Sequence, residues 1–188
     1  MERSASSQRA LDDGAPGTLW ERQCTQMELG TSVLTIDAYQ PRDVTAVACL
    51  AHTAFDGSSD GAPLEAWVRK VSAITSGRYG TFLPDASFVI RQDDAQLPVG
   101  VALVTDFPLY EAPVVALICV VPSQQCRGMG GTLLRMCVHH LALSGFNRCR
   151  AKISLTNEAS RRLFQSQGFR EVKRVPHAPK GGEPSSDE

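Results

Sequence analysis

The sequence has almost no net charge and no long apolar segment. Its 188 residues contain 19 Lys and Arg against 20 Asp and Glu, which gives a net charge of −1. Binding to nucleic acid is driven by clustered basic side chains at the phosphates, so this balance argues against a nucleic-acid partner. A membrane span needs about 18 or more apolar residues in a row, and a signal peptide needs a shorter apolar core near its start. The sequence offers neither, and we expect no membrane partner.

The cysteines lack the spacing that zinc sites and redox motifs require. Neither a C-x-x-C pair nor a zinc-like Cys/His pattern occurs. Several of the six lie in apolar runs, where a free thiol behaves as a small hydrophobic side chain. They are Cys24, Cys49, Cys119, Cys126, Cys137 and Cys149. We therefore expect reduced thiols, no bound metal and a cytoplasmic location.

The most informative stretch joins a predicted strand to a predicted helix. The β-branched apolar residues of Val114–Val121 predict the strand, which stops at Pro122, and an amphipathic pattern over Gly130–Leu143 predicts the helix. The loop between them has glycines at positions 128, 130 and 131. Glycines adopt positive φ and let a ligand approach the backbone, while a helix start presents unpaired N–H groups and a positive dipole end. This order of elements favours binding of a phosphate group.

Two common nucleotide motifs do not match this loop. It lacks the Gly-Lys-Ser/Thr ending of a P-loop, so the lysine that contacts a triphosphate and the hydroxyl that binds magnesium are both missing. The G-x-G-x-x-G spacing of dinucleotide-binding folds also fails, because the glycines lie at 128, 130 and 131. A kinase or a GTPase is therefore not indicated. A nucleotide-binding protein that uses the same loop is the weakest of the readings that remain.

Two short motifs in this half of the chain fit one known family. The first is Gln/Arg-x-x-Gly-x-Gly/Ala, which Gln125–Gly130 matches just after a strand that ends in Val-Pro. The second is Asn-x-x-Ala-x-x-Leu-Tyr-x-x-x-Gly-Phe, which Asn157–Phe169 resembles. The first alone would also fit a plain glycine turn, whereas the two in this order are far more specific. Together they resemble the acyl-CoA pyrophosphate loop and the following helix of the GCN5-related N-acetyltransferase (GNAT) superfamily.

The resemblance implies the GNAT fold, which is an α/β (α+β) domain. It has a mixed central β-sheet of six to seven strands flanked by about four helices. The length of 188 residues and a hydrophobic content of 43% agree with one such domain. We expect the domain to occupy residues 18–176, followed by a flexible C-terminal tail over residues 177–188. Residues 1–17 are polar and cannot offset the entropy cost of ordering, so we expect a disordered N-terminal tail there.

Apolar periodicity and turn residues predict the order of elements within this domain. Helices are expected from Pro41 to Phe55, from Pro63 to Ser76, from Gly130 to Leu143, and after the capping residue Asn157. Strands are expected over Thr31–Tyr39, Ser87–Arg91, Val99–Thr105, Val114–Val121, Arg148–Leu155 and Phe169–Val175. In the family, the two helices after the first strand form a wall of the acceptor site. The family usually ends with a further strand, for which the sequence shows no candidate.

The resemblance also implies acetyl-CoA as the acyl donor and assigns residues to it. The strand before the loop would splay from its neighbour, so that Ile118, Cys119 and Val120 contact the pantetheine arm. The Val120 N–H would face the thioester oxygen, a contact worth about 3 kcal/mol in well-studied hydrolases. The pyrophosphate would be held mainly by backbone N–H groups of Gln125, Cys126, Arg127, Gly128, Met129, Gly130 and Gly131, with the Thr132 hydroxyl nearby. Asn157 would reach the arm, although helix capping alone also explains this asparagine, and Phe164 would lie beside the cofactor.

The chain departs from the family pattern where the proton transfers would occur. Phe164 stands where a tyrosine often protonates the leaving thiolate, although a thiol of pKa about 8.5 leaves readily without help. Lys152 stands where relatives that acetylate protein N-termini often carry a carboxylate. The general base stays unassigned, because each candidate is equally well explained as a solvated loop residue. The candidates are Tyr79, Asp85, Asp106, Tyr110 and Glu111.

The sequence thus predicts an acetyl-CoA-dependent N-acetyltransferase. It would transfer the acetyl group to a primary amine of a small molecule or a protein by direct attack on the thioester. The alternative is a non-catalytic acyl-CoA-binding module, suggested by Phe164, Lys152 and the missing last strand. Family members often dimerise through edge strands, so an incomplete sheet would also favour a homodimer.

Overall fold

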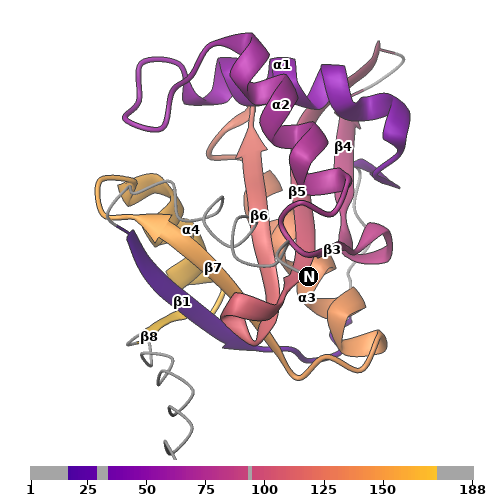
Figure 1. Cartoon of the computed structure of the whole chain (residues 1–188), viewed down its shortest axis with the longest axis vertical. Helices are drawn as coiled ribbons and strands as arrows, with labels where there is room; N and C mark the ends of the chain where they lie inside the picture. Colours follow the sequence, from indigo (N-terminus) through magenta and orange to yellow (C-terminus); the bar gives the residue numbers. More distant parts are fainter. Residues whose placement is uncertain (1–16, 29–33, 93–94, 173–188) are drawn as a thin grey trace, which may run out of the picture.

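The computed structural model describes residues 17–28, 34–92 and 95–172. These residues form one mixed sheet with helices on both faces (Figure 1). The helices are α1 (Val44–Phe55), α2 (Leu64–Thr75), α3 (Met129–Leu143) and α4 (Glu158–Ser166). The strands are β1 (Gly17–Gln23), β2 (Thr35–Ala38), β3 (Thr81–Phe82), β4 (Phe88–Gln92), β5 (Ala95–Phe107), β6 (Ala112–Val120), β7 (Arg148–Ser154) and β8 (Arg170–Val172).

The helices and most strands form where apolar periodicity predicts them. The helix expected from Pro41 begins as a short 3₁₀ turn over Pro41–Asp43 and continues as α1, and the other three agree within a residue or two. The expected C-terminal tail and most of the expected N-terminal tail lie outside the described residues, but Gly17 already belongs to β1. In the part of the chain that the structure describes, no helix is long and apolar enough to cross a bilayer.

The sheet has the strand order β2-β4-β5-β6-β7-β1-β8, and β3 pairs with β5 at the side of this path. All pairs are antiparallel except β6 with β7. The α/β class with a mixed sheet and four helices is as expected. The described sheet has eight strands instead of six to seven because β1 and the two-residue β3 join it.

Two apolar clusters lie on opposite faces of the sheet. Side chains alternate along a strand, so neighbouring residues of β5 face different helices. Val101 and Leu103 belong to the cluster under α1 and α2, whereas Ala102 and Val104 belong to the cluster under α3 and α4. Both faces are therefore covered, as the apolar composition of the central strands requires.

The strand expected over Thr31–Tyr39 is present as β2, but it is not the first strand, because β1 precedes it. β1 pairs along its length with β7 and on its other edge with β8. Its sequence does not alternate, since buried Trp20 is followed by two charged residues. The charge at Glu21 is explained by pairing, because its carboxylate accepts from Arg150 Nε at 2.6 Å and lies 3.7 Å from Arg148 Nη1. Apolar periodicity could not reveal this strand, because the carboxylate of Glu21 pairs with arginines of the neighbouring strand β7.

β1 bears on the further strand with which the family usually ends and for which the sequence shows no candidate. Among the described residues, β8 pairs with β1 and not with a later strand. The N-terminal strand therefore occupies one side of β8, a place that a further C-terminal strand could otherwise take. The edges of the described sheet are β2 and β8. Dimerisation through an edge strand stays a prediction.

β6 has a bulge just after the residue at which it pairs with β7. Its register with β5 shifts between Leu103 and Val104, which leaves Ala116 as the extra residue. The parallel pairing of β6 with β7 is confined to Val114 opposite Arg150 in the described sheet. Beyond this point β7, β1 and β8 lean away from β6 (Figure 1). The two halves of the sheet are thus joined at one end of β6 and open at the other.

We predict that Trp20→Ala lowers the free energy of unfolding by about 3–5 kcal/mol, because it removes a large side chain that is only 6% exposed in the core. Urea unfolding measures the change. Gln23→Ala, at an exposed position of the same strand, is the control and should change stability by about 0.5 kcal/mol or less. Equal stability of the two variants would contradict the placement of β1 in the sheet.

Candidate active site

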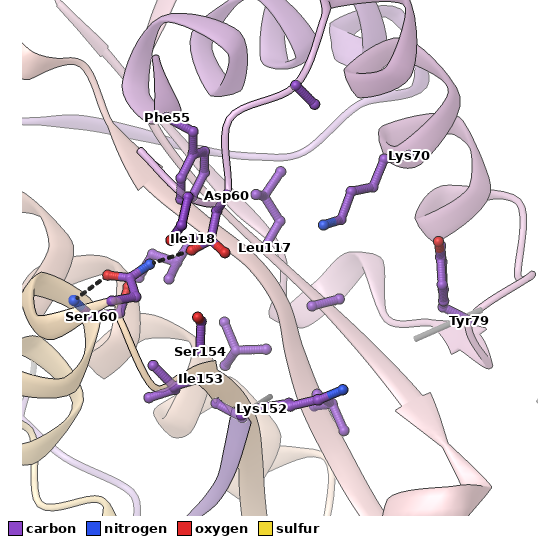
Figure 2. Close-up of a pocket in the computed structure, with 18 of the residues that line it drawn as sticks. Phe55, Asp60, Lys70, Tyr79, Leu117, Ile118, Lys152, Ile153, Ser154 and Ser160 are labelled. Carbon is purple, nitrogen blue, oxygen red and sulfur yellow. Dashed lines mark hydrogen bonds between the residues drawn. The ribbon is translucent and has the colours of Figure 1, made fainter. Parts of the chain in front are cut away.

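A cavity of about 430 Å³ lies where β6 and β7 diverge. Its walls come from β6, β7, the loop between α1 and α2, helix α2, and the start of α4 (Figure 2). The bulged residue Ala116 and its neighbours Leu117 and Ile118 line it on the β6 side. The pocket therefore occupies the opening that the fold leaves in its own sheet.

The edge of β6 that faces β7 carries backbone N–H groups that point toward the opening between the two strands. The Val121 N–H donates to the Val99 carbonyl of β5 at 2.9 Å. Because N–H groups alternate along a strand, those of Val120 and Ile118 point the other way, toward the β7 side. The Val120 carbonyl on that edge accepts a hydrogen bond from Gln125 Nε2 at 3.0 Å. Gln125 thereby ties the loop after β6 to the end of the strand.

The three residues assigned to the pantetheine arm lie in different environments. Ile118 lines the cavity. Val120 packs into the cluster under α3, and Cys119 packs into the cluster under α1 and α2. Burial raises the pKa of the Cys119 thiol well above its usual range. A thiol that stays protonated is a poor nucleophile, so the structure does not support acyl transfer through Cys119.

The glycine loop forms the start of α3 beside the end of β6. Cys126 has φ 61°, and Gly128, which precedes the first helical residue, has φ 81°. Gly130 and Gly131 face α4, where an added Cβ would lie 3.0 Å from a Leu163 methyl group and 3.0 Å from Gln167 Nε2. These two glycines thus let α3 and α4 approach closely.

The eight residues assigned to the pyrophosphate do not line the cavity itself. Residues 125–128 are exposed, whereas Met129 and Gly131 are buried. The Thr132 hydroxyl accepts from Arg135 Nη2 at 3.0 Å. The loop has the left-handed conformations and the helix start that a phosphate cradle requires. It lies at the end of β6 whose edge opens on the cavity.

Asn157 bridges two walls of the cavity. Its Oδ1 accepts from the Ser160 N–H at 3.0 Å and so caps α4, while its Nδ2 donates to Asp60 Oδ2 at 2.9 Å (Figure 2). The neighbouring hydroxyls of Ser59 and Thr156 are 2.8 Å apart. The loop after α1 is thereby fastened to the turn after β7, across the opening of the sheet.

A known family model matches residues 58–169, which is more than half of the chain. That model is described as the acetyltransferase (GNAT) family. The chain belongs to this family. No curated protein matches the chain at a significant level.

Solved GNAT structures share the fold at low sequence identity. A GCN5-related N-acetyltransferase from Sphaerobacter thermophilus has a TM-score of 0.65 at 14% identity, over 83% of this chain and 48% of its own. The ribosomal-protein-S18-alanine N-acetyltransferase from Escherichia coli has a TM-score of 0.57 at 19% identity, over 75% and 80%. AAC(6')-Iy in complex with the bisubstrate analogue CoA-S-monomethyl-acetylneamine has a TM-score of 0.56 at 19% identity, over 80% and 100%. This chain thus spans about half of the Sphaerobacter protein, and the GNAT fold expected from the sequence is confirmed.

Two of the five candidate bases of this GNAT protein line the cavity, and three do not. Tyr79 and Tyr110 line it. The candidates Asp85, Asp106 and Glu111 are not among its lining residues. Lys152, which stands at the position of a carboxylate in some relatives, does line the cavity.

Sequence reasoning missed two charged residues of the cavity, Asp60 and Lys70. Asp60 lies in a segment rich in Gly, Ser and Asp that has the composition of a plain turn. Lys70 follows buried Trp67 by three positions in α2 and so lies on the same face, with its Nζ 5.1 Å from the Trp67 ring centroid. That i,i+3 relation is the signal that could have indicated Lys70.

Phe164 lines the cavity without offering a proton. It is 2% exposed and packs edge-to-face on Phe169, with the ring centroids 4.9 Å apart.

The adjacent histidines His139 and His140 lie on α3, away from the cavity. The ring centroid of His140 is 4.8 Å from that of Phe88, and burial and the adjacent His139 lower the pKa of His140. Neither histidine lines the cavity. In the described residues, no group of three or more His, Cys, Asp or Glu could hold a metal ion.

We predict that Asp60→Ala and Asn157→Ala are energetically coupled. The bond between them contributes about 1 kcal/mol, so the double variant should lose about that much less stability than the sum of the single variants. Denaturant unfolding of the four proteins gives this coupling. The exposed pair Glu158–Arg162 on α4, with N···O 2.9 Å, is the comparison and should couple by about 0.5 kcal/mol or less. Zero coupling between residues 60 and 157 would contradict the bridge.

Proposed function

We propose that this GNAT protein is an acetyl-CoA-dependent N-acetyltransferase that acts on a primary amine of a small molecule or a protein. The observation that carries the proposal is the open edge of β6, which runs from the cavity to a loop with the geometry of a phosphate-binding site. A donor with a diphosphate and a long flexible arm fits such a site. The named N-acetyltransferase from E. coli and AAC(6')-Iy with its CoA analogue support this choice, because both share the fold.

The residues present fit a CoA group. The backbone at residues 125–131 would hold the diphosphate, since Cys126 and Gly128 adopt left-handed conformations before the start of α3. Arg127 and the Thr132 hydroxyl lie in the same loop and first turn. The arm would follow the edge of β6 past Val120 and Ile118, and Asn157 and Phe164 would face it from α4. Bound acetyl-CoA supplies an acetyl group activated as a thioester.

The chemistry needs a neutral amine that attacks this thioester. A C–N bond forms as the C–S bond breaks, the amine gives up a proton to a base, and CoA leaves as thiol or thiolate. The Val120 N–H would donate to the carbonyl oxygen as charge builds on it. The cavity beside Leu117 would hold the acceptor on the side covered by α2. No acid is needed from Phe164, because a thiol is acidic enough to leave as thiolate.

A non-catalytic acyl-CoA-binding module is the second candidate. It is favoured by the absence of a hydroxyl at Phe164 and by the lysine at position 152. Turnover decides between the two, since a module would bind CoA without releasing thiol in the presence of any amine. The missing last strand was the third reason for this candidate, and it is weakened because β1 pairs with β8.

We predict that acetyl-CoA and CoA, but not ATP, raise the thermal midpoint of the protein. A ligand at a hundred times its Kd stabilises the protein by about 2.7 kcal/mol, which raises the thermal midpoint by a few degrees.

We predict that Cys126→Asp weakens CoA binding about tenfold or more, because it places a negative charge in the loop. Cys126→Asn is the matched control, since asparagine also tolerates positive φ but carries no charge. Equal affinity of the two variants, or a preference for ATP, would contradict the assignment of the loop.

We predict that Val120→Pro slows acetyl transfer about 100-fold or more while CoA still binds. Proline deletes one N–H, and the structure directs this N–H to the open edge of β6, where the sheet does not use it. Val120→Ala keeps the N–H and should stay within about threefold of the wild-type rate. A single-turnover assay with an accepted amine measures both. If the proline variant folds and matches the alanine variant, the Val120 N–H has no role in the transfer.

A further inference from the structure

Asp60 is the one carboxylate among the described residues that line the cavity. The other ionisable side chains of this lining are Lys70, Lys152, Tyr79 and Tyr110, and it includes no histidine, glutamate or cysteine of the described chain. An ammonium group only donates hydrogen bonds, and a phenolic hydroxyl already carries its proton, whereas an ionised carboxylate only accepts. Of these side chains, Asp60 is therefore the one suited to take a proton from an amine.

The turn after α1 holds the backbone of Asp60 in place. The Asp60 N–H donates to Ser58 Oγ at 3.2 Å, and this hydroxyl donates to the Phe55 carbonyl at 2.7 Å. The N–H of Gly61 donates to the Ser58 carbonyl at 3.0 Å. Only glycine fits at position 61 without a shift, because an added Cβ would lie 2.8 Å from the Phe55 carbonyl oxygen. The carboxylate is thus carried by an ordered turn.

The Asp60 carboxylate is held through one of its two oxygens. Oδ2 accepts from Asn157 Nδ2 at 2.9 Å, and the orientation of that amide is set because Asn157 Oδ1 accepts from the Ser160 N–H at 3.0 Å. Within the part of the chain that the structure describes, Oδ1 of Asp60 makes no hydrogen bond or ion pair. The side chain is half-buried. One oxygen therefore fixes the direction of the carboxylate, and the other can accept from a ligand.

The carboxylate lies on the side of the cavity that belongs to the proposed donor site. Figure 2 shows Asp60 reaching from its loop into the pocket, on the side of Leu117 and Ile118 of β6. The N–H of Val120 points to the same open edge of β6 as that of Ile118. Asn157, which bonds to Asp60, is the residue expected to face the arm of the donor. An amine that attacks a thioester held along this edge comes within the part of the cavity that Asp60 lines.

We propose that Asp60 is the catalytic base of the transfer. As the amine nitrogen attacks, the C–N bond forms and the C–S bond breaks, with its electron pair leaving on sulfur. The proton that the nitrogen loses goes to Asp60 Oδ1, and from there it passes to solvent or to the departing CoA thiolate. This inference rests on the proposed N-acetyltransferase function.

Two variants separate the carboxylate from the bridge that it makes. Asp60→Asn keeps an oxygen that accepts from the Asn157 amide but is no base, whereas Asn157→Ala removes the bridge and keeps the carboxylate. Thiol release from saturating acetyl-CoA is measured with ethylamine, phenethylamine and free lysine as acceptors. With the amines that the wild-type protein acetylates, we expect Asp60→Asn to lower kcat about 100-fold or more and Asn157→Ala to lower it about tenfold or less. CoA affinity of Asp60→Asn should stay within about threefold of the wild-type value.

Rescue by an external base is the readout that a structural residue would not give. Asp60→Ala leaves room for a small carboxylate, so formate should raise its kcat about tenfold or more. Formate should leave the kcat of Asn157→Ala unchanged, because that variant still has its carboxylate. Sodium chloride at equal ionic strength is the control for the salt, and unfolding curves show that the variants are folded.

Two results would overturn the inference while the proposed function stands. One is a kcat of Asp60→Asn equal to that of Asn157→Ala, and the other is a rate of Asp60→Ala that formate raises no more than chloride does. A third result overturns both proposals. It is a wild-type protein that binds CoA but releases no thiol with any of the three amines, as a non-catalytic module would.

Discussion

The divergence of β6 from β7 is the feature on which the rest of the site depends. Two parallel strands that stayed paired would use their edge groups on each other and leave no room between them. Here the described pairing is confined to Val114 opposite Arg150, and the bulge at Ala116 follows at once. The opening costs backbone hydrogen bonds, which a ligand that runs along the edge can restore. The cavity, the free edge and the glycine loop then lie in sequence along one strand.

An opening in a sheet also has to be closed from outside, and this chain does so with two contacts distant in sequence. The loop after α1 is fastened to α4 through Asp60 and Asn157, and β1 joins β7 to β8. The second contact stiffens the half of the sheet that carries Lys152. A strand from the N-terminal side of the chain thus completes the wall opposite α2. The cavity therefore combines residues from both ends of the described chain.

Much of the fold was predictable because its signals are local. The helices α1 to α4 follow apolar periodicity, and the turn from β6 into α3 follows from a proline and glycines at fixed places. β1 was not predictable in the same way, because Glu21 is satisfied by arginines on β7 that lie far away in sequence. The loop that we propose holds the donor could be selected from two motifs. The places of Asp60 and Lys70 could not, since these residues reach the cavity only through the packing of the α1–α2 segment against the second half of the sheet.

Backbone amide exchange with and without CoA tests the central claim, that the open edge of β6 is where the donor binds. The account predicts slower exchange at Ile118, Val120 and residues 126–131 when CoA is present, because edge amides gain partners and the loop is covered. The amides of Cys119 and Val121, which point toward β5, serve as internal controls and should change little. Protection confined to other parts of the protein, with Ile118 and Val120 unchanged, would show that the donor does not bind in the opening of the sheet.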